Sequence, residues 1–268
     1  MSIGKMINTM AITGMATQLA ISFIAPLGLL IYFRKRKWLS WKPLGIGMLI
    51  FILFSQVLEK MLHMIMIDAD GASLKWTDSK ALFVLYAVLA AGIFEEVGRY
   101  IGFKWMLKNH RDYKDGLSFG LGHGGIEAVL IGAFGAINAI VLASMIQSGT
   151  FDKMIAPTLP KEQAALIKDM VLHTPFSMYV LAGLERVFAL AFHIAMSLLV
   201  LLGVREQKFR YIIFAILLHA LMDVAPALYQ ARVMTNIWLV EAIAFLFAVA
   251  AFLFTRRVKD ALEDGGER

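Results

Sequence analysis

The segment that decides how this chain folds is FVLYAVLAAGIFEEVGRYIGF, residues 83–103. It is long and apolar enough to cross a lipid bilayer as a helix, since a span needs about 20 mainly apolar residues. Its second half nevertheless contains Glu95, Glu96 and Arg99. A charged side chain at the bilayer centre costs about 2.5–3.5 kcal/mol on insertion scales, so these three residues are the first candidates for a functional site.

The whole chain has the composition of an integral membrane protein. Of its 268 residues, 59% are hydrophobic and only 17% are charged, and the mean hydropathy is +0.70. The net charge of +6 comes from short basic clusters between apolar runs, without the interleaved aromatic residues that stack on bases, which argues against nucleic acid as a partner. The absence of cysteine excludes disulfides, thiolate metal ligands and a cysteine nucleophile.

Seven apolar runs are long enough to span a membrane, which predicts an all-α, polytopic helix bundle in the cell membrane with the lipid bilayer as its partner. The runs fill most of the chain, so we expect one membrane domain over residues 1–268, with the functional motifs between about residues 80 and 230. The runs cover residues 9–33, 43–66, 80–103, 116–145, 176–203, 209–230 and 234–255.

Basic clusters predict how the bundle is oriented. RKRK at 34–37, KWMLKNHRDYK at 104–114, REQKFR at 205–210 and RRVK at 256–259 all fall on one side of the predicted spans. Because positively charged loops favour the cytoplasm, we expect the N-terminus outside and the C-terminus in the cytoplasm. On the opposite side, PKEQAALIKDMVLH at 160–173 predicts a short amphipathic helix on the outer surface.

Polar residues recur at helical spacing inside the predicted spans. Glu95 and Arg99, His123 and Glu127, and His219 and Asp223 are each four residues apart, so each pair lies on one helix face; the fifth span adds Glu185, Arg186 and His193. Counted from the cytoplasmic ends, the central members of the set share one depth, as groups lining one cavity must. Glu59 and His63 have the same spacing but lie toward the other end of their span, so they are left out of the predicted site.

Three interpretations of these polar residues remain open from their spacing alone. Interhelical ion pairs, for instance Arg99 with Glu95 and Arg186 with Glu127, would hold the bundle together. A proton- or ion-coupled transporter would line a translocation path with Glu and His, although it should distribute them over the full depth. A hydrolytic or metal site would need neutral histidines, and three of them share one depth.

The motif order resembles that of the intramembrane protease superfamily of CAAX prenyl endopeptidases and bacteriocin-processing enzymes. The closest branch is the YhfC-like one, with PrsW-type proteases as relatives. Glu95, Glu96 and Arg99 match its paired-glutamate motif, Phe119 with His123 matches FxxxH, and His219 with Asp223 matches a late HxxxN or HxxxD. His193 stands where an additional histidine motif occurs. The chain has EExxR where the CAAX enzymes usually have EExxxR, so the resemblance leaves open which glutamate is the base.

The resemblance implies an intramembrane endopeptidase that hydrolyses a membrane-anchored protein or peptide in a cavity near the cytoplasmic side. It implies Glu95, Glu96, His123 and His219 as catalytic residues, supported by Arg99, Glu127, Glu185, His193 and Asp223. In a metal-dependent version, His123 and His219, with His193 as a further candidate, would bind Zn²⁺ or another divalent ion together with a carboxylate; in a metal-free version, Glu and His would activate water directly. The sequence does not choose between the two versions.

Overall fold

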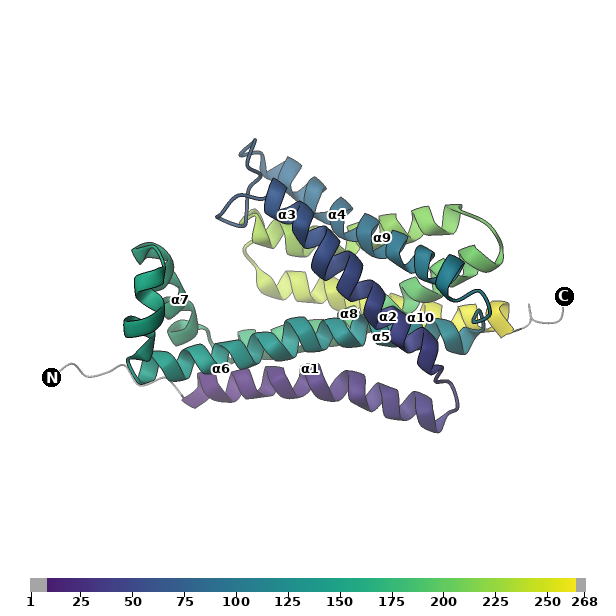
Figure 1. The fold of residues 1–268 in the computed structure, drawn as a ribbon, viewed down its shortest axis with the longest axis horizontal. Coiled ribbons are helices and arrows are strands. Elements are labelled where there is room, and N and C mark those ends of the chain that lie inside the picture. The colour runs from purple at the N-terminus through teal and green to yellow at the C-terminus, as the bar shows by residue number, and fades with distance from the viewer. Residues whose placement is uncertain (1–8, 264–268) are drawn as a thin grey trace. The chain divides into compact units, whose positions relative to one another are not determined.

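The structure is a computed structural model that describes residues 9–263, most of which are helical (Figure 1). In chain order the segments are α1 (Thr9–Lys35), α2 (Trp41–Ile50), a π-helical segment (Phe51–Glu59), α3 (Lys60–Met66), α4 (Lys80–Ile101), a π-helical segment (Gly102–Met106), α5 (Tyr113–Glu127), a π-helical segment (Ala128–Ala133), α6 (Phe134–Gln147), a π-helical segment (Phe151–Ile155), a 3₁₀ turn (Ala156–Thr158), α7 (Lys161–His173), α8 (Phe176–Arg205), α9 (Arg210–Gln230) and α10 (Ile237–Glu263).

Seven helical stretches of the described chain are long and apolar enough to cross a membrane, which confirms the predicted all-α, seven-span architecture. Several stretches extend beyond the apolar run that predicted them. The last helix continues to Glu263, eight residues past the run that ends at residue 255, because RRVKDALE consists largely of good helix formers and contains no proline or glycine. The stretches are Thr9–Lys35, Trp41–Met66, Lys80–Met106, Tyr113–Gln147, Phe176–Arg205, Arg210–Gln230 and Ile237–Glu263.

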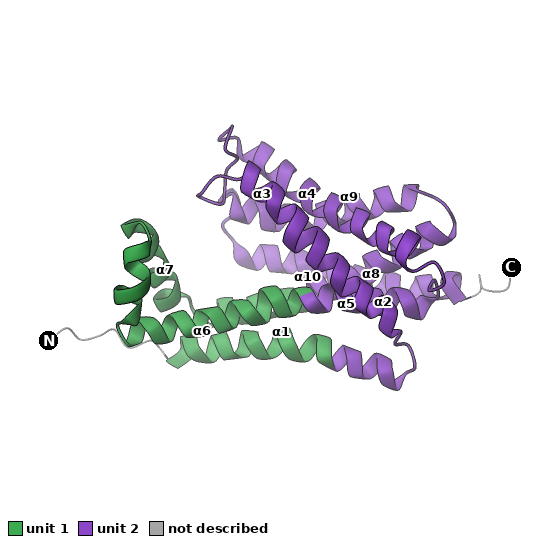
Figure 2. Ribbon diagram, viewed as in Figure 1, with its two compact units in different colours: residues 1–27, 127–187 green, residues 28–126, 188–268 purple. Residues whose placement is uncertain are grey.

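The described chain forms two compact units (Figure 2). Unit 1 contains residues 9–27 and 127–187, and its apolar core joins α1 to α6, α7 and the first turns of α8 through Met15, Ala143, Val171 and Tyr179. α7 begins directly after Pro160, as predicted for this segment. Its position on the outer surface and the orientation of the two termini remain predictions.

Unit 2 contains residues 28–126 and 188–263 of the described chain and holds the larger apolar core. α4 packs closely on α9, because Gly92 lets the backbone of α4 approach that of α9: a Cβ at this position would lie 2.8 Å from the Ile216 carbonyl oxygen. α2 and its π-helical continuation pack on α4, and the C-terminal part of α8 contributes many of the fully buried apolar side chains.

Glycines of α5 permit unusually close contacts inside unit 2. A Cβ at Gly120 would collide with the α8 backbone at Ile194, and one at Gly122 would collide with the carbonyl of Leu44 on α2. A Cβ at Gly124 would make a tight contact, 3.1 Å from the Cα of Leu190. Small residues, and glycine most of all, permit such close backbone approach between membrane helices. α5 is therefore held tightly between α2 and α8, and His123 lies within this glycine-rich segment.

Candidate active site

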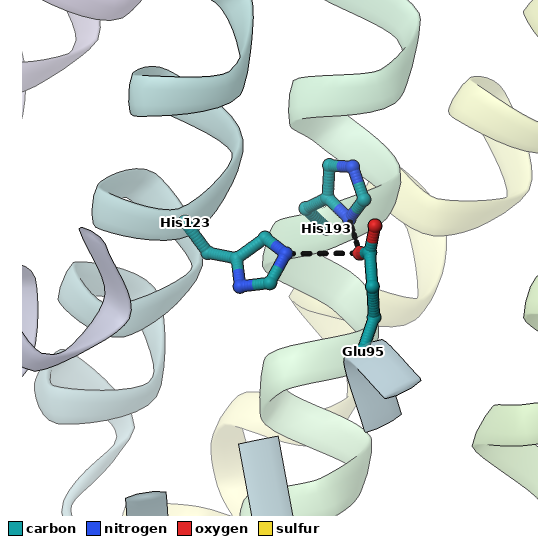
Figure 3. Close-up of side chains that lie close together, drawn as sticks. All are labelled: Glu95, His123 and His193. Atoms are coloured by element: carbon teal, nitrogen blue, oxygen red, sulfur yellow. Dashed lines mark hydrogen bonds and ion pairs between the residues drawn. The ribbon is translucent and has the colours of Figure 1, made fainter. Parts of the chain in front are cut away.

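The carboxylate of Glu95 is the centre of a buried polar group in unit 2. Its Oε2 atom lies 2.9 Å from His123 Nε2, 3.7 Å from His193 Nδ1 and 3.9 Å from His219 Nε2. These three histidines come from α5, α8 and α9, and Glu95 comes from α4. Figure 3 shows His123 and His193 directed at the Glu95 carboxylate from two separate helices. All four side chains are buried.

Arg99 supplies the positive charge of this group. Its Nη2 atom lies 3.2 Å from Glu95 Oε2 and 2.6 Å from His193 Nδ1, and its Nη1 atom forms an ion pair with Glu96. A guanidinium has donors only, so His193 Nδ1 must accept from it. Arg99 is fully buried. Its contacts with Glu95, Glu96 and His193 connect both glutamates of α4 to α8. We call Glu95, Glu96, Arg99, His123, His193 and His219 the Glu95 group.

Glu96 has surroundings different from those of Glu95. One of its oxygens, Oε1, accepts from Arg99 and lies 2.6 Å from His219 Nδ1. A carboxylate accepts only, so Nδ1 of His219 carries a hydrogen, and Nε2 is the ring atom at which a second proton is gained or lost. Nε2 lies 3.6 Å from Asp223 Oδ2 and faces Glu95. Glu96 is fully buried and orients His219, whereas Glu95 faces three histidines.

Aromatic side chains hold the imidazole rings in place. Phe51 contacts His123 edge-on at a centroid distance of 5.1 Å, and Phe192 contacts His219 edge-on at 5.6 Å. Phe119, the Phe of the FxxxH motif, stacks with the His123 ring at a centroid distance of 6.4 Å and contacts the tilted ring of Phe103 at 4.4 Å. Phe51 and Phe192 were missed from the sequence, because phenylalanines in a Phe-rich membrane protein give no signal that separates these two from the rest.

Two predicted supporting residues belong to a different group. Glu127 and Glu185 both form ion pairs with Arg186 in unit 1, and the Glu127 Oε1 to Arg186 Nη1 distance is 2.6 Å. Both ion pairs considered in the sequence are present: Arg99 with Glu95 within α4, and Arg186 of α8 with Glu127 of α5. In the Glu95 group, however, the ion pair is only one part of a cluster with three histidines.

A second polar group lies in unit 2, at the Glu59 and His63 pair that was left out of the predicted site. Glu59 Oε1 is 3.2 Å from His63 Nε2, and His63 Nδ1 is 2.8 Å from the hydroxyl of Tyr86 on α4. We call these three residues the Glu59 group. The spacing of Glu59 and His63 was visible in the sequence, but Tyr86 resembles any other aromatic residue of its span.

Comparison with known proteins identifies the family. A family model described as "YhfC intramembrane metalloprotease" matches residues 21–244. The chain belongs to the YhfC family. A Bacillus subtilis (strain 168) member described as "Uncharacterized membrane protein YhfC" is 36% identical over 254 residues, which cover 95% of this chain and 98% of the relative. No solved structure matches the chain.

Membership of the YhfC family confirms the closest branch of the predicted resemblance and the assignment as a multi-pass membrane protein. The wider relation to CAAX prenyl endopeptidases and PrsW-type proteases remains a prediction. The family description names a metalloprotease, so a metal ion is implied and the residues of unit 2 can be tested for their fit to it.

The Glu95 group offers a donor set compatible with the metal that the YhfC description implies. Glu95, His123 and His193 each present one ligand atom, and the three atoms lie within 4.8 Å of one another. One carboxylate and two imidazoles are a ligand set that catalytic zinc sites use. Arg99 Nη2 contacts Glu95 Oε2 and His193 Nδ1. The guanidinium and a metal ion would therefore compete for the lone pairs of these two atoms. Of the predicted metal ligands, His219 instead bonds Glu96.

Proposed function

We propose that this protein is an intramembrane endopeptidase that hydrolyses a peptide bond of a membrane-associated protein or peptide at the Glu95 group. One observation carries the proposal: Oε2 of Glu95 is approached within 4 Å by imidazoles from three other helices and by Arg99. Buried charges in a membrane protein are expensive and usually serve function. Membership of the YhfC family supports the same reaction class.

The two glutamates take different roles in the proposed reaction. Glu95 faces His123 and His193, so its carboxylate can hold a water molecule, or a metal ion together with these two histidines. Glu96 is engaged by Arg99 and by His219 Nδ1, so it acts as the residue that orients His219. We therefore assign the water-activating centre to Glu95 rather than to Glu96.

Hydrolysis adds the hydroxyl of water to the carbonyl carbon and a proton to the departing amine. His219 is suited to carry that proton, because Glu96 fixes the hydrogen on Nδ1 and leaves Nε2 facing Glu95. Arg99 keeps a permanent positive charge beside both carboxylates, which limits the repulsion between them. When bound by Glu95, His123 and His193, a zinc ion would polarise the scissile carbonyl and make water more acidic.

A cleavage assay with matched variants tests the proposal. The purified protein is reconstituted in liposomes with a reporter whose transmembrane segment is followed by a fluorescent domain, and Glu95→Gln and His123→Ala are compared with Glu59→Gln. Glu59 is buried to the same degree as Glu95, with 7% and 6% of their surfaces exposed. We expect loss of cleavage in the first two variants and retention in the third. Equal cleavage by Glu95→Gln and the unaltered protein would refute the assignment.

Metal content separates the two mechanistic versions. The purified protein and His123→Ala are measured by elemental analysis after dialysis against trace zinc. About one zinc per chain in the unaltered protein, and a clear loss in His123→Ala, would support the metal-dependent version. Active protein without stoichiometric metal would instead support direct activation of water by Glu95 and His219.

A further inference from the structure

An apolar groove lies between α8, α9 and α10, outside the Glu95 group. Its volume is about 490 Å³, within the range of small-molecule sites. All three helices line it. The lining residues run from Phe192 to Leu199 on α8, from Tyr211 to Leu221 on α9 and from Phe247 to Phe254 on α10. Leu217 and Leu221 line the groove and are 55% and 56% exposed, so it opens on the surface of a membrane-spanning helix.

The length of the groove fits one leaflet of a bilayer. Its α9 lining runs over ten residue-to-residue steps, from Tyr211 near the start of the helix to Leu221 near its middle. At 1.5 Å per residue this is about 15 Å, which is half of the roughly 30 Å hydrocarbon core. A groove of this length, open to lipid along an apolar helix face, matches a single acyl chain that enters from the membrane interface.

Basic side chains flank the interfacial end of the groove. The guanidinium of Arg210 lies over the ring of Tyr211 at 5.5 Å, and Arg257 follows Phe254 by one turn on the same face of α10. Both arginines are exposed. Among residues 9–263 neither forms an ion pair, and the nearby Glu206 and Glu263 pair with Lys208 and Lys259.

We propose that this groove binds an anionic glycerophospholipid, with one acyl chain along α9 and the phosphate at Arg210 and Arg257. An apolar groove with a basic rim at the membrane surface is complementary to that class of lipid in both shape and charge. The groove continues the lipid-facing surface of the protein, so the ligand is already at hand in the bilayer. This lipid site does not depend on the proposed protease activity.

The inner end of the groove adjoins the Glu95 group through a single ring. Phe192 lines the groove and also contacts His219 edge-on at 5.6 Å. On its other side Phe192 packs against Phe247 at 6.1 Å, and Phe247 also lines the groove. A bound acyl chain would therefore complete the packing around Phe192 and restrict the orientations open to the His219 ring.

Lipid retention measured by native mass spectrometry tests the proposal. The full-length protein in detergent is mixed with equal amounts of phosphatidylglycerol and phosphatidylcholine that carry the same chains. We expect retention of phosphatidylglycerol in excess, by roughly five-fold for each arginine. The double variant Arg210→Gln and Arg257→Gln should keep lipid but lose the preference. No preference in the unaltered protein, or an unchanged preference in the double variant, would overturn the anionic assignment.

Variants of α10 test the acyl-chain position. Ala250 lines the groove and is exposed, so Ala250→Trp should fill it and remove most bound lipid of both kinds. Ala242→Trp, an equally large change at an exposed alanine two turns earlier that does not line the groove, should retain lipid as the unaltered protein does. Equal retention by both variants would overturn the site.

A photoreactive residue at position 250 identifies the occupant directly. With benzoylphenylalanine there, the purified protein in phosphatidylglycerol liposomes should yield a lipid adduct on illumination. A covalent dimer without lipid adduct would show that a second copy of the chain covers this face, and it would overturn the proposal.

Discussion

Glu95 and Glu59 are both buried glutamates of unit 2 that pair with a residue four positions later. The Glu95 Oε2 to Arg99 Nη2 distance and the Glu59 Oε1 to His63 Nε2 distance are both 3.2 Å. They differ in what reaches them from other helices. The Glu95 group combines side chains of α4, α5, α8 and α9, whereas the Glu59 group adds only Tyr86. Burial and spacing are thus shared by both groups, and convergence of several helices distinguishes the candidate site.

The largest expected difference between the two groups concerns catalysis. Changing His219 to Ala should lower the cleavage rate by roughly 10²–10⁴-fold, the usual contribution of a positioned acid or base. Changing His63 to Ala should leave the rate nearly unchanged, because within residues 9–263 the ion pair and hydrogen bond of His63 both lie inside the Glu59 group. Initial rates of reporter cleavage in liposomes measure both variants. Similar rate losses in both would remove the functional distinction drawn above.

A second difference concerns stability. Arg99→Gln removes the only guanidinium of the Glu95 group and leaves two buried carboxylates without their counter-charge, so we expect a loss of about 3–5 kcal/mol in the free energy of unfolding. Lys60→Gln changes an exposed side chain beside the Glu59 group and should alter the free energy of unfolding by less than about 0.5 kcal/mol. Denaturant unfolding in mixed micelles gives both values. A small loss in Arg99→Gln would mean that the carboxylates accept protons instead.

The close contact of α5 with α2 offers a test of how the Glu95 group is assembled. A Cβ at Gly122 would meet the Leu44 carbonyl, so Gly122→Ala should cost about 1–3 kcal/mol of stability and displace His123. Gly45→Ala, where a Cβ meets nothing within 4 Å, is the matched control on α2 and should be close to neutral. Unfolding and cleavage are measured together. An active, fully stable Gly122→Ala would show that α5 can shift without loss of the site.

The smallest expected effect is at Tyr86. Tyr86→Phe removes the hydroxyl that lies 2.8 Å from His63 Nδ1 and should cost about 0.5–1.5 kcal/mol, the net value of one hydrogen bond. Cleavage should be unaffected. Phe83→Leu, a larger change in the apolar core of the same helix, should lower stability without affecting cleavage and so controls for loss of packing. A loss of cleavage in Tyr86→Phe alone would connect the two groups functionally.

Much of this arrangement could be predicted from the sequence. Apolar length gave seven spans, and four-residue spacing assigned Glu95 and Arg99 to one helix face. The three histidines of matching depth do meet at one carboxylate. These predictions succeeded because helix length and helix phase are local properties that follow from residue order alone.

The remaining features depend on how distant segments pack. Spacing could not show that Glu96 bonds His219 while Glu95 faces His123. Adjacent residues point in different directions from the helix axis, and the sequence does not say which neighbouring helix lies in each direction. Nor could it separate Glu127 from His123, which share a face of one helix yet have different partners. Such choices are set by side-chain fit between helices, including the glycine contacts of α5.

The ion pairs of α4 have a consequence for how the protein enters the membrane. Both glutamates and their counter-ion belong to a single turn of a single helix. α4 can therefore leave the aqueous phase with one of its two carboxylate charges already compensated, before α5, α8 and α9 have arrived. The histidines that later surround Glu95 carry no obligatory charge, so His123, His193 and His219 need add no further ionic cost. α4 can therefore insert into the membrane as a first step, and the polar centre can assemble around Glu95 in a later one.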